Sequence, residues 1–250
     1  SWNGYTGAAL RSISGNNSWG GNITLGQATT IGTDSGSNFT ISGGISGANN
    51  LTVNSTGNTT ISGIIGTSTG TLTKNGAGTL LLTANNTYTG ATTVNAGTLE
   101  LSSTGLLGGG SYSGNIANTG TLLLGSNSNQ TLSGVISGAG AITKNGSGTL
   151  TISNAASTYN GTLTINTGRI SAGTAAASAK INAGSLTIGA GTGYDFTISS
   201  VSTSVAGTDY DQIALPLLLW LKPSLPKYQT STAIVLSPLR RYFVRSTRSK

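Results

Sequence analysis

Residues 71–101 read TLTKNGAGTLLLTANNTYTGATTVNAGTLEL and contain four short runs in which apolar residues, mostly Leu or Val, are interspersed with Thr. The runs cover 71–74, 79–83, 91–95 and 98–101, and Asn and Gly separate them. Period-two alternation predicts strands, because successive side chains leave a strand on opposite faces. Asn and Gly accept positive φ, so their positions predict tight turns between the strands.

This stretch has a second copy at 141–172, which reads AITKNGSGTLTISNAASTYNGTLTINTGRISA. Related lead-ins precede the two copies at 61–65 and 132–136, and a third relative lies at 42–54. Repeated strand-and-turn units of this kind predict stacked rungs rather than a closed globule.

The two copies resemble the autotransporter-associated β-strand repeat, also called the passenger-associated transport repeat. The resemblance covers 71–101 almost completely and 141–172 with a one-residue insertion before Tyr159, and it extends less specifically over most of residues 1–214. The repeat-motif residues of the first copy are Lys74, Asn75, Gly76, Gly78, Tyr88, Gly90, Asn95 and Gly97. Those of the second copy are Lys144, Asn145, Gly146, Gly148, Tyr159, Gly161, Asn166 and Gly168.

The resemblance implies a fold and a location but no activity. It implies an all-β chain folded as a right-handed parallel β-helix, in a bacterial protein that is secreted or displayed at the cell surface in association with the outer membrane. It also implies that the intact protein is longer and carries a translocating β-barrel elsewhere.

Turn chemistry alone leaves a hairpin alternative open. Asn-Gly is a strong hairpin signal, and strands spaced by eight to twelve residues would suit a β-sandwich equally. The family resemblance favours stacking, and at roughly 20 residues per rung residues 1–214 would form about ten rungs. The apolar residues expected to point inward and stack between the copies are Leu72, Leu80, Leu82, Val94, Leu99 and Leu101 with Ile142, Leu150, Ile152, Leu163, Ile165 and Ile170. Asn95 and Asn166 are expected to form ladders of side-chain amides.

The amino-acid composition excludes several kinds of catalytic site, metal site and cross-link. The chain of 250 residues has 39 Gly, only 7% charged residues, and no Cys, Met or His. Without His, Ser-His-Asp and Cys-His catalysis are excluded in this chain, as are the usual zinc sites. Without Cys there are no disulfides. We expect no cofactor and no metal, and the absence of Met indicates a fragment or processed piece.

Charge divides the chain at residue 214. Residues 1–214 hold five basic and five acidic residues, whereas 215–250 hold seven basic residues, no acid, all four prolines and none of the 39 glycines. We therefore predict a β-solenoid over 1–214 and a separate, poorly ordered basic tail over 215–250. The first interpretation of the tail is a frame-shifted translation. The alternatives are a basic arm for membrane or nucleic acid, and a short anchor, although the apolar run 215–221 is far below the ~20 residues needed to span a membrane.

Few residues qualify as functional candidates. Asp209 and Asp211 are the best candidate pair of catalytic carboxylates for a polysaccharide lyase or hydrolase. The preferred interpretation of this pair is that both acids are solvated at a turn. Lys74 and Lys144 could form a basic stripe for anionic glycan, and the preferred interpretation is solvated turn residues that protect strand edges. Tyr88 and Tyr159 could stack on sugars, and the preferred interpretation is packing over a rung corner. We expect Trp2 and Trp19 to cover the end of the stack.

The sequence thus predicts a structural stalk rather than an enzyme. Its rungs would hold distal regions away from the cell and could assist secretion, because each rung templates the next. The alternatives are an adhesin that binds glycan or a host surface protein through Thr/Asn faces or the tyrosines, and a polysaccharide-active enzyme. We expect no nucleic-acid partner and no transmembrane segment in this chain.

Overall fold

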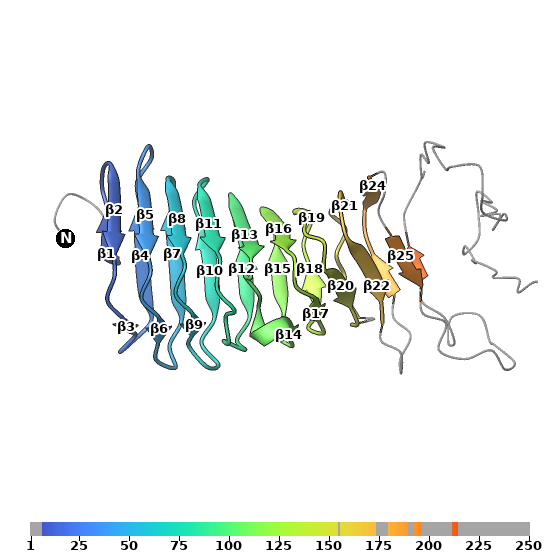
Figure 1. Ribbon diagram of the computed structural model, residues 1–250, viewed down its shortest axis with the longest axis horizontal. Coiled ribbons are helices and arrows are strands. Elements are labelled where there is room, and N and C mark those ends of the chain that lie inside the picture. The colour runs from blue at the N-terminus through green and yellow to red at the C-terminus, as the bar shows by residue number, and fades with distance from the viewer. Residues whose placement is uncertain (1–6, 155, 174–179, 190–192, 197–211, 215–250) are drawn as a thin grey trace, which may run out of the picture.

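The computed structural model describes residues 7–154, 156–173, 180–189, 193–196 and 212–214. In this part the chain coils into stacked rungs of short strands (Figure 1). Strands of successive rungs pair in parallel and form the long sheets of a β-solenoid. The predicted parallel β-helix is confirmed, and the hairpin alternative is wrong for the described residues.

Two long sheets form two sides of the coil. The first sheet contains β1 (Ala8–Ser12), β4 (Thr29–Thr33), β7 (Leu51–Ser55), β10 (Leu72–Asn75), β12 (Thr92–Val94), β15 (Ile116–Asn118) and β18 (Ile136–Ser137). The second sheet contains β2 (Asn16–Trp19), β5 (Asn38–Ile41), β8 (Asn58–Ile61), β11 (Thr79–Leu82), β13 (Thr98–Ser103), β16 (Thr121–Ser126), β19 (Ala141–Lys144), β21 (Thr162–Ile165) and β24 (Ser185–Ile188).

The third side is built from shorter pieces. Early rungs contribute β3 (Ile23–Thr24), β6 (Ile45–Ser46) and β9 (Ile65–Gly66). Later rungs contribute β14 (Ser111–Tyr112), β17 (Gln130–Leu132), β20 (Thr149–Ile152), β22 (Arg169–Ala172) and β25 (Gly193–Phe196). A 3-10 turn over Gly108–Gly110 precedes β14, and β23 (Lys180–Asn182) pairs with β26 (Gln212–Ala214).

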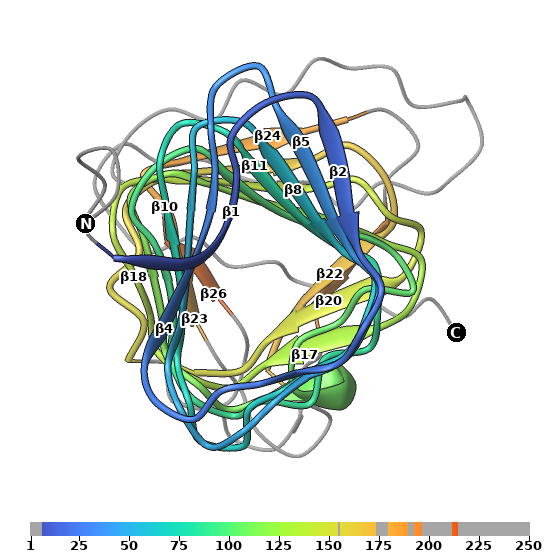
Figure 2. The ribbon, with the colours of Figure 1, turned by 90° about the vertical axis from the view of Figure 1, so that its left-hand side faces the viewer.

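Figure 2 looks along the coil from its N-terminal end. The chain runs from β1 up to β2, down the right side and back to β4, so it turns clockwise as it recedes from the viewer. That sense is right-handed, as predicted, and it is the usual hand for a crossover between parallel strands.

The length of one turn varies from rung to rung around the predicted value of roughly 20 residues. Leu80 is in register with Leu99 on the next rung, which is a short turn, and Thr92 is in register with Ile116, which is a longer one. Loops at the corners absorb this variation, so the strands stay in register. The nine strands of the second sheet define eight steps along the coil, each ~4.8 Å.

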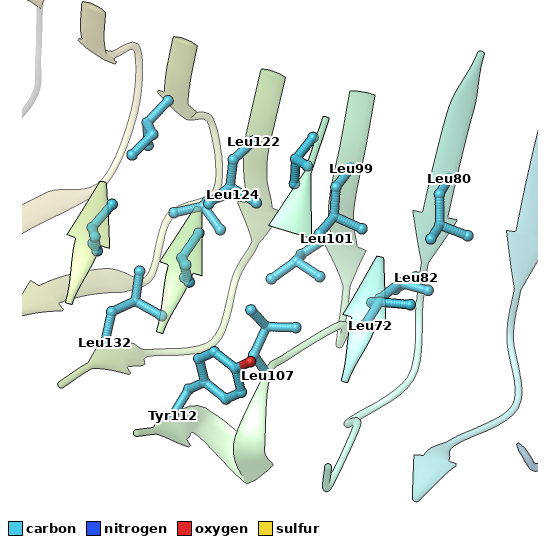
Figure 3. Close-up of a cluster of buried hydrophobic side chains, with 14 of the residues drawn as sticks. Leu72, Leu80, Leu82, Leu99, Leu101, Leu107, Tyr112, Leu122, Leu124 and Leu132 are labelled. Atoms are coloured by element: carbon cyan, nitrogen blue, oxygen red, sulfur yellow. The ribbon is translucent and has the colours of Figure 1, made fainter. Parts of the chain in front are cut away.

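The interior is a continuous apolar core. The twelve residues expected to point inward are all buried, with 0–3% of their surface exposed. Leucines of adjacent rungs lie in columns, such as Leu80, Leu99 and Leu122 in the second sheet (Figure 3). Complete burial of each such side chain contributes about 1.5–3 kcal/mol, so the stacked columns are the main source of stability.

The predicted stacking between the copies is confirmed in part. Leu80 and Leu99 share a column with Ile142 and Leu163, and Leu82 and Leu101 share one with Ile165. However, Leu72 and Ile142, which are equivalent in the two copies, do not share a column. The register of the first sheet leads from Leu72 through Thr92 and Ile116 to Ile136. The counterpart of Leu72 in the second copy is Ile142, which follows Ile136 in the chain and lies in the second sheet. The second copy therefore starts one side further around the coil. Its β19 and β20 occupy the second and third sides, whereas β10 and β11 of the first copy occupy the first and second.

Candidate functional site

The two repeat lysines are buried, which corrects both interpretations drawn from the sequence. Lys74 is 0% exposed and Lys144 is 3% exposed. Each lies at an inward position near the end of its strand, between aliphatic residues of the adjacent rungs: Val53 and Val94 flank Lys74, and Leu124 and Ile165 flank Lys144. Neither lysine can form a surface stripe for glycan or protect a strand edge. The period-two pattern placed Lys74 on the same face as Leu72, and this signal was overlooked because lysines are seldom fully buried.

Backbone carbonyl oxygens surround the Lys74 amine. Its Nζ donates to the carbonyl oxygens of Asn75 at 2.8 Å and Gly76 at 2.7 Å, both in its own corner. It also reaches the carbonyl oxygen of Ala96 at 3.3 Å, in the corner of the next rung. The side chain therefore links two successive corners.

Lys144 shares part of this arrangement at another corner. Its Nζ donates to the carbonyl oxygen of Gly146. The next rung approaches closely, because a Cβ placed on Gly168 would lie 2.9 Å from this Nζ. A side chain on residue 168 would therefore collide with the amine.

Burial shifts the ionisation of both amines in the same direction. Desolvation disfavours the charged form of a base, and it lowers the pKa of Lys74 from 10.5 to about 8. Burial also lowers the pKa of Lys144. The Lys74 amine is thus still mostly protonated at neutral pH, where its carbonyl acceptors partly replace lost water.

The repeat glycines are required by contact between rungs. At all eight predicted glycines, a Cβ would come within 1.8–2.5 Å of a backbone carbonyl oxygen in the preceding rung. Gly78 is one of the tightest, with Gly57 O at 1.8 Å. Gly76 also has φ +79°, a conformation that L residues other than Gly adopt infrequently. These positions let successive corners stack at the sheet spacing.

The repeat asparagines form amide pairs along the outside of the corners. Asn95 Nδ2 donates to Asn75 Oδ1 and Asn166 Nδ2 donates to Asn145 Oδ1, each at 2.8 Å. The structure thus contains the pairs expected for Asn95 and Asn166. A longer ladder that the sequence analysis missed joins Asn16, Asn38 and Asn58, with N–O distances of 2.8 and 3.2 Å. Its signal was an Asn at the start of three successive strands in register.

Tyr88 and Tyr159 are buried, 0% and 4% exposed, so the sugar-stacking interpretation is wrong and the corner-packing one is confirmed. Tyr159 Oη lies 2.8 Å from Gly140 O and 2.6 Å from Thr162 O. Tyr88 Oη, Thr92 Oγ1 and Tyr112 Oη form a chain with 2.8 and 2.7 Å links, and Tyr112 Oη donates to Gly90 O.

Tyr112 was not singled out from the sequence, although Tyr112-Ser113-Gly114 matches the Tyr-x-Gly pattern of Tyr88 and Tyr159. It lies edge-on to Tyr88, with ring centroids 5.7 Å apart. Burial raises the pKa of Tyr112 to about 12 and raises the pKa of Tyr88 and Tyr159 as well. All three phenols are therefore neutral hydrogen-bonding groups of the core.

The remaining candidates are dispersed or lie outside the described residues. Asp34 pairs with Arg11, with Arg11 Nε 2.9 Å from Asp34 Oδ1. Trp19 is 44% exposed and stands in register with Ile41, at the N-terminal end of that column. Trp2, Asp209, Asp211 and the tail 215–250 lie outside the described residues. Within the residues that are described, no three His, Cys, Asp or Glu side chains are grouped so as to hold a metal ion.

The structural class is a right-handed β-solenoid whose Lys-Asn-Gly corners bury the lysine side chain (Figure 2). Residues 72–101 and 142–174 match the family model of the Passenger-associated-transport-repeat. The two matches confirm the resemblance for the two repeat copies. Together they cover about a quarter of the 250 residues and leave the wider resemblance over 1–214 a prediction. Searches of curated proteins and of solved structures returned no match. The described part contains no helix that is both long and apolar enough to span a membrane.

Proposed function

We propose that this chain is a segment of the surface-exposed stalk of a bacterial autotransporter-type protein, whose intact form carries a translocating β-barrel. The observation that supports this most directly is the coincidence of two passenger-associated transport repeats with an unbroken parallel ladder from β2 to β24. A solenoid whose rungs contact only their neighbours is a stiff spacer that grows in length without changing its cross-section.

Rung-by-rung folding gives the stalk a second role, in secretion. Each completed rung offers an ordered edge on which the next rung pairs, so folding outside the cell would retain translocated chain. Leu80 and Leu150 belong to this ladder and are 0% exposed. Placing a carboxylate at either position buries an unpaired charge and should stop the ladder at that rung.

The test fuses the whole chain to a heterologous autotransporter barrel and follows surface exposure by protease accessibility. Leu80→Asp and Leu150→Asp should reduce the surface-exposed fraction severalfold, whereas Leu80→Met should leave it unchanged because it conserves volume. Normal exposure of both Asp variants would refute the role of rung folding in secretion. Absence of an elongated particle in small-angle scattering of the purified chain would refute the stalk itself.

A second candidate, glycan binding, rests on one feature of the first sheet. Thr30, Thr52, Thr73 and Thr93 are in register on four successive rungs and half-buried at its outer face. A row of hydroxyl groups at ~4.8 Å spacing is suited to a repeating polar ligand. A glycan array with the purified chain tests this: binding that is lost in Thr52→Val plus Thr73→Val supports an adhesin, and signal at background refutes it.

A further inference from the structure

The Lys-Asn-Gly corners hold a buried amine for which neither the stalk function nor the family match accounts. We propose that each corner is an internal site for a primary alkylammonium group, that the lysine's own side chain is its occupant, and that this occupant fixes the geometry of two successive rungs. The chemical class of ligand is R–NH₃⁺, recognised by converging backbone carbonyl oxygens. The site is separate from any external ligand surface.

The contacts of Lys74 are those of a binding site for an amine, and not those of a side chain that only fills space in the core. Three N–H donors of an ammonium group meet three carbonyl oxygens, two at 2.7–2.8 Å in one corner and one at 3.3 Å in the next. The acceptors come from consecutive rungs, so occupancy couples the corner of Asn75 and Gly76 to that of Ala96. A side chain that only filled volume would not need donors there.

An exchange of residues between rungs supports the assignment. Rungs that precede the ones containing Lys74 and Lys144 have an aliphatic residue in register with the lysine and a hydroxyl residue two positions later. The pairs are Ile31 with Thr33, Val53 with Ser55, and Leu124 with Ser126. These hydroxyl residues are buried under the corner. In the two lysine rungs the corresponding residues are Gly76 and Gly146, so the hydroxyl is absent and the lysine amine contacts the carbonyl oxygen of that glycine instead.

The exchange is sterically enforced. A Cβ on Gly76 would lie 2.5 Å from Ser55 O, and one on Gly146 would lie 1.8 Å from Ser126 O. A rung stacked this closely on a buried serine has no room for its own hydroxyl side chain. The amine comes from the strand, two residues earlier, and makes a polar contact of a different kind: the hydroxyls of Thr33 and Ser55 contact Thr59 Oγ1, whereas the amine contacts a corner carbonyl oxygen.

The two sites occupy different corners of the coil. Lys74 lies between the first and second sheets, and Lys144 lies between the second and third. The same serine, lysine and glycine arrangement therefore forms in two settings with different neighbours. This independence indicates that the site is a property of the local motif and not of one side of the solenoid.

Hydrogen exchange of the corner amides tests the proposal. Gly78 N donates to Ser55 O and Asn95 N donates to Lys74 O, each at 2.9 Å, so these amides report on the two corners. Lys74→Met keeps an unbranched side chain that is one heavy atom shorter, and removes the donors. We expect exchange at Gly78 and Asn95 to accelerate about tenfold or more, as for the loss of a charge-assisted hydrogen bond. Leu99→Met, a buried change with no polar role, is the matched control, and equal exchange in both variants would overturn the proposal.

Chemical rescue identifies the ligand class. Lys74→Ala removes the equivalent of a propylammonium group, so n-propylammonium chloride should slow the accelerated exchange of Gly78 and Asn95. Tetramethylammonium chloride at the same ionic strength has no N–H donor and should not. Equal effects of the two salts would show that the corner does not recognise an amine.

The unaltered chain provides a test that does not depend on variant folding. Acetylation with an N-hydroxysuccinimide ester followed by peptide mass spectrometry should leave Lys74 and Lys144 unmodified in the folded protein and modify both in concentrated urea. Labelling of either lysine at the same rate with and without urea would overturn the proposal.

Discussion

Leu80 and Leu81 are adjacent on β11 and chemically identical, but they should differ sharply in their contribution to stability. Leu80 is 0% exposed and lies between Thr59 and Leu99, whereas Leu81 is on the outer face beside Glu100. Leu→Ala removes the equivalent of about three buried methylene groups at ~0.8 kcal/mol each, and a cavity adds to this. We expect Leu80→Ala to lower the free energy of unfolding by about 2–5 kcal/mol and Leu81→Ala by less than about 1 kcal/mol.

Urea denaturation followed by circular dichroism measures the difference. With a slope of about 1–3 kcal/mol per molar urea, Leu80→Ala should lower the midpoint by roughly 1 M or more, and Leu81→Ala should leave it nearly unchanged. Because rungs can unfold locally, hydrogen exchange at Leu82 and Leu101 checks that the loss is centred on this rung. Equal effects, or a larger effect at Leu81, would refute the register, since a slip of one residue exchanges the two faces.

Three further predictions follow from the corners and the core. Gly78→Ala should lower stability by about 2–4 kcal/mol because its Cβ would meet Gly57 O at 1.8 Å, whereas Gly26→Ala, with nothing within 4 Å, should be nearly neutral in the same urea assay. Thr92→Val should cost about 1–3 kcal/mol by leaving the buried Tyr88 hydroxyl without its acceptor, and Tyr88→Phe should cost less because Thr92 keeps Tyr112; the reverse order of thermal midpoints would contradict the hydrogen-bond chain. Finally, because burial lowers the pKa of Lys74 to about 8, the unfolded chain binds more protons than the folded one between about pH 8 and 10.5, so stability should rise with pH across that window. Lys74→Met should flatten this rise, and an unchanged slope would show that Lys74 is not its source.

Much of the fold could be predicted because the strands are short and their pattern is local. The four runs in 71–101 became β10, β11, β12 and β13, and Leu or Val at alternate positions determined which face is inward. Asn and Gly marked the corners for a steric reason, since a Cβ at the repeat glycines would collide with the preceding rung. None of this needs information from distant residues.

The lysines show where local reasoning failed. Their positions in the pattern were inward, but their charged side chains were assigned to the surface from their usual preference. For the tyrosines, the preferred interpretation of packing over a rung corner was confirmed, but their hydrogen-bond partners were not predicted. Stacking of the rungs adds distant partners to the local ones: Ala96 O for Lys74, and Tyr112, through Thr92, for Tyr88. Ala96 lies 22 residues from Lys74, and Tyr112 lies 20 residues from Thr92, so a short window of sequence does not display these partners, whereas Thr92 is only four residues from Tyr88.

By itself the sequence determined the strands, the corners and the repeat family, because each depends on residues that are neighbours along the chain. The tertiary structure alone decided which side of the coil each repeat occupies. That depends on the accumulated length of the corner loops between the copies, since the chain from Leu72 to Ile142 is longer than the three turns that end at Ile136. It also decided that the two lysines act inside the solenoid, because Ala96 O, one acceptor of the Lys74 amine, becomes adjacent only when one rung packs on another.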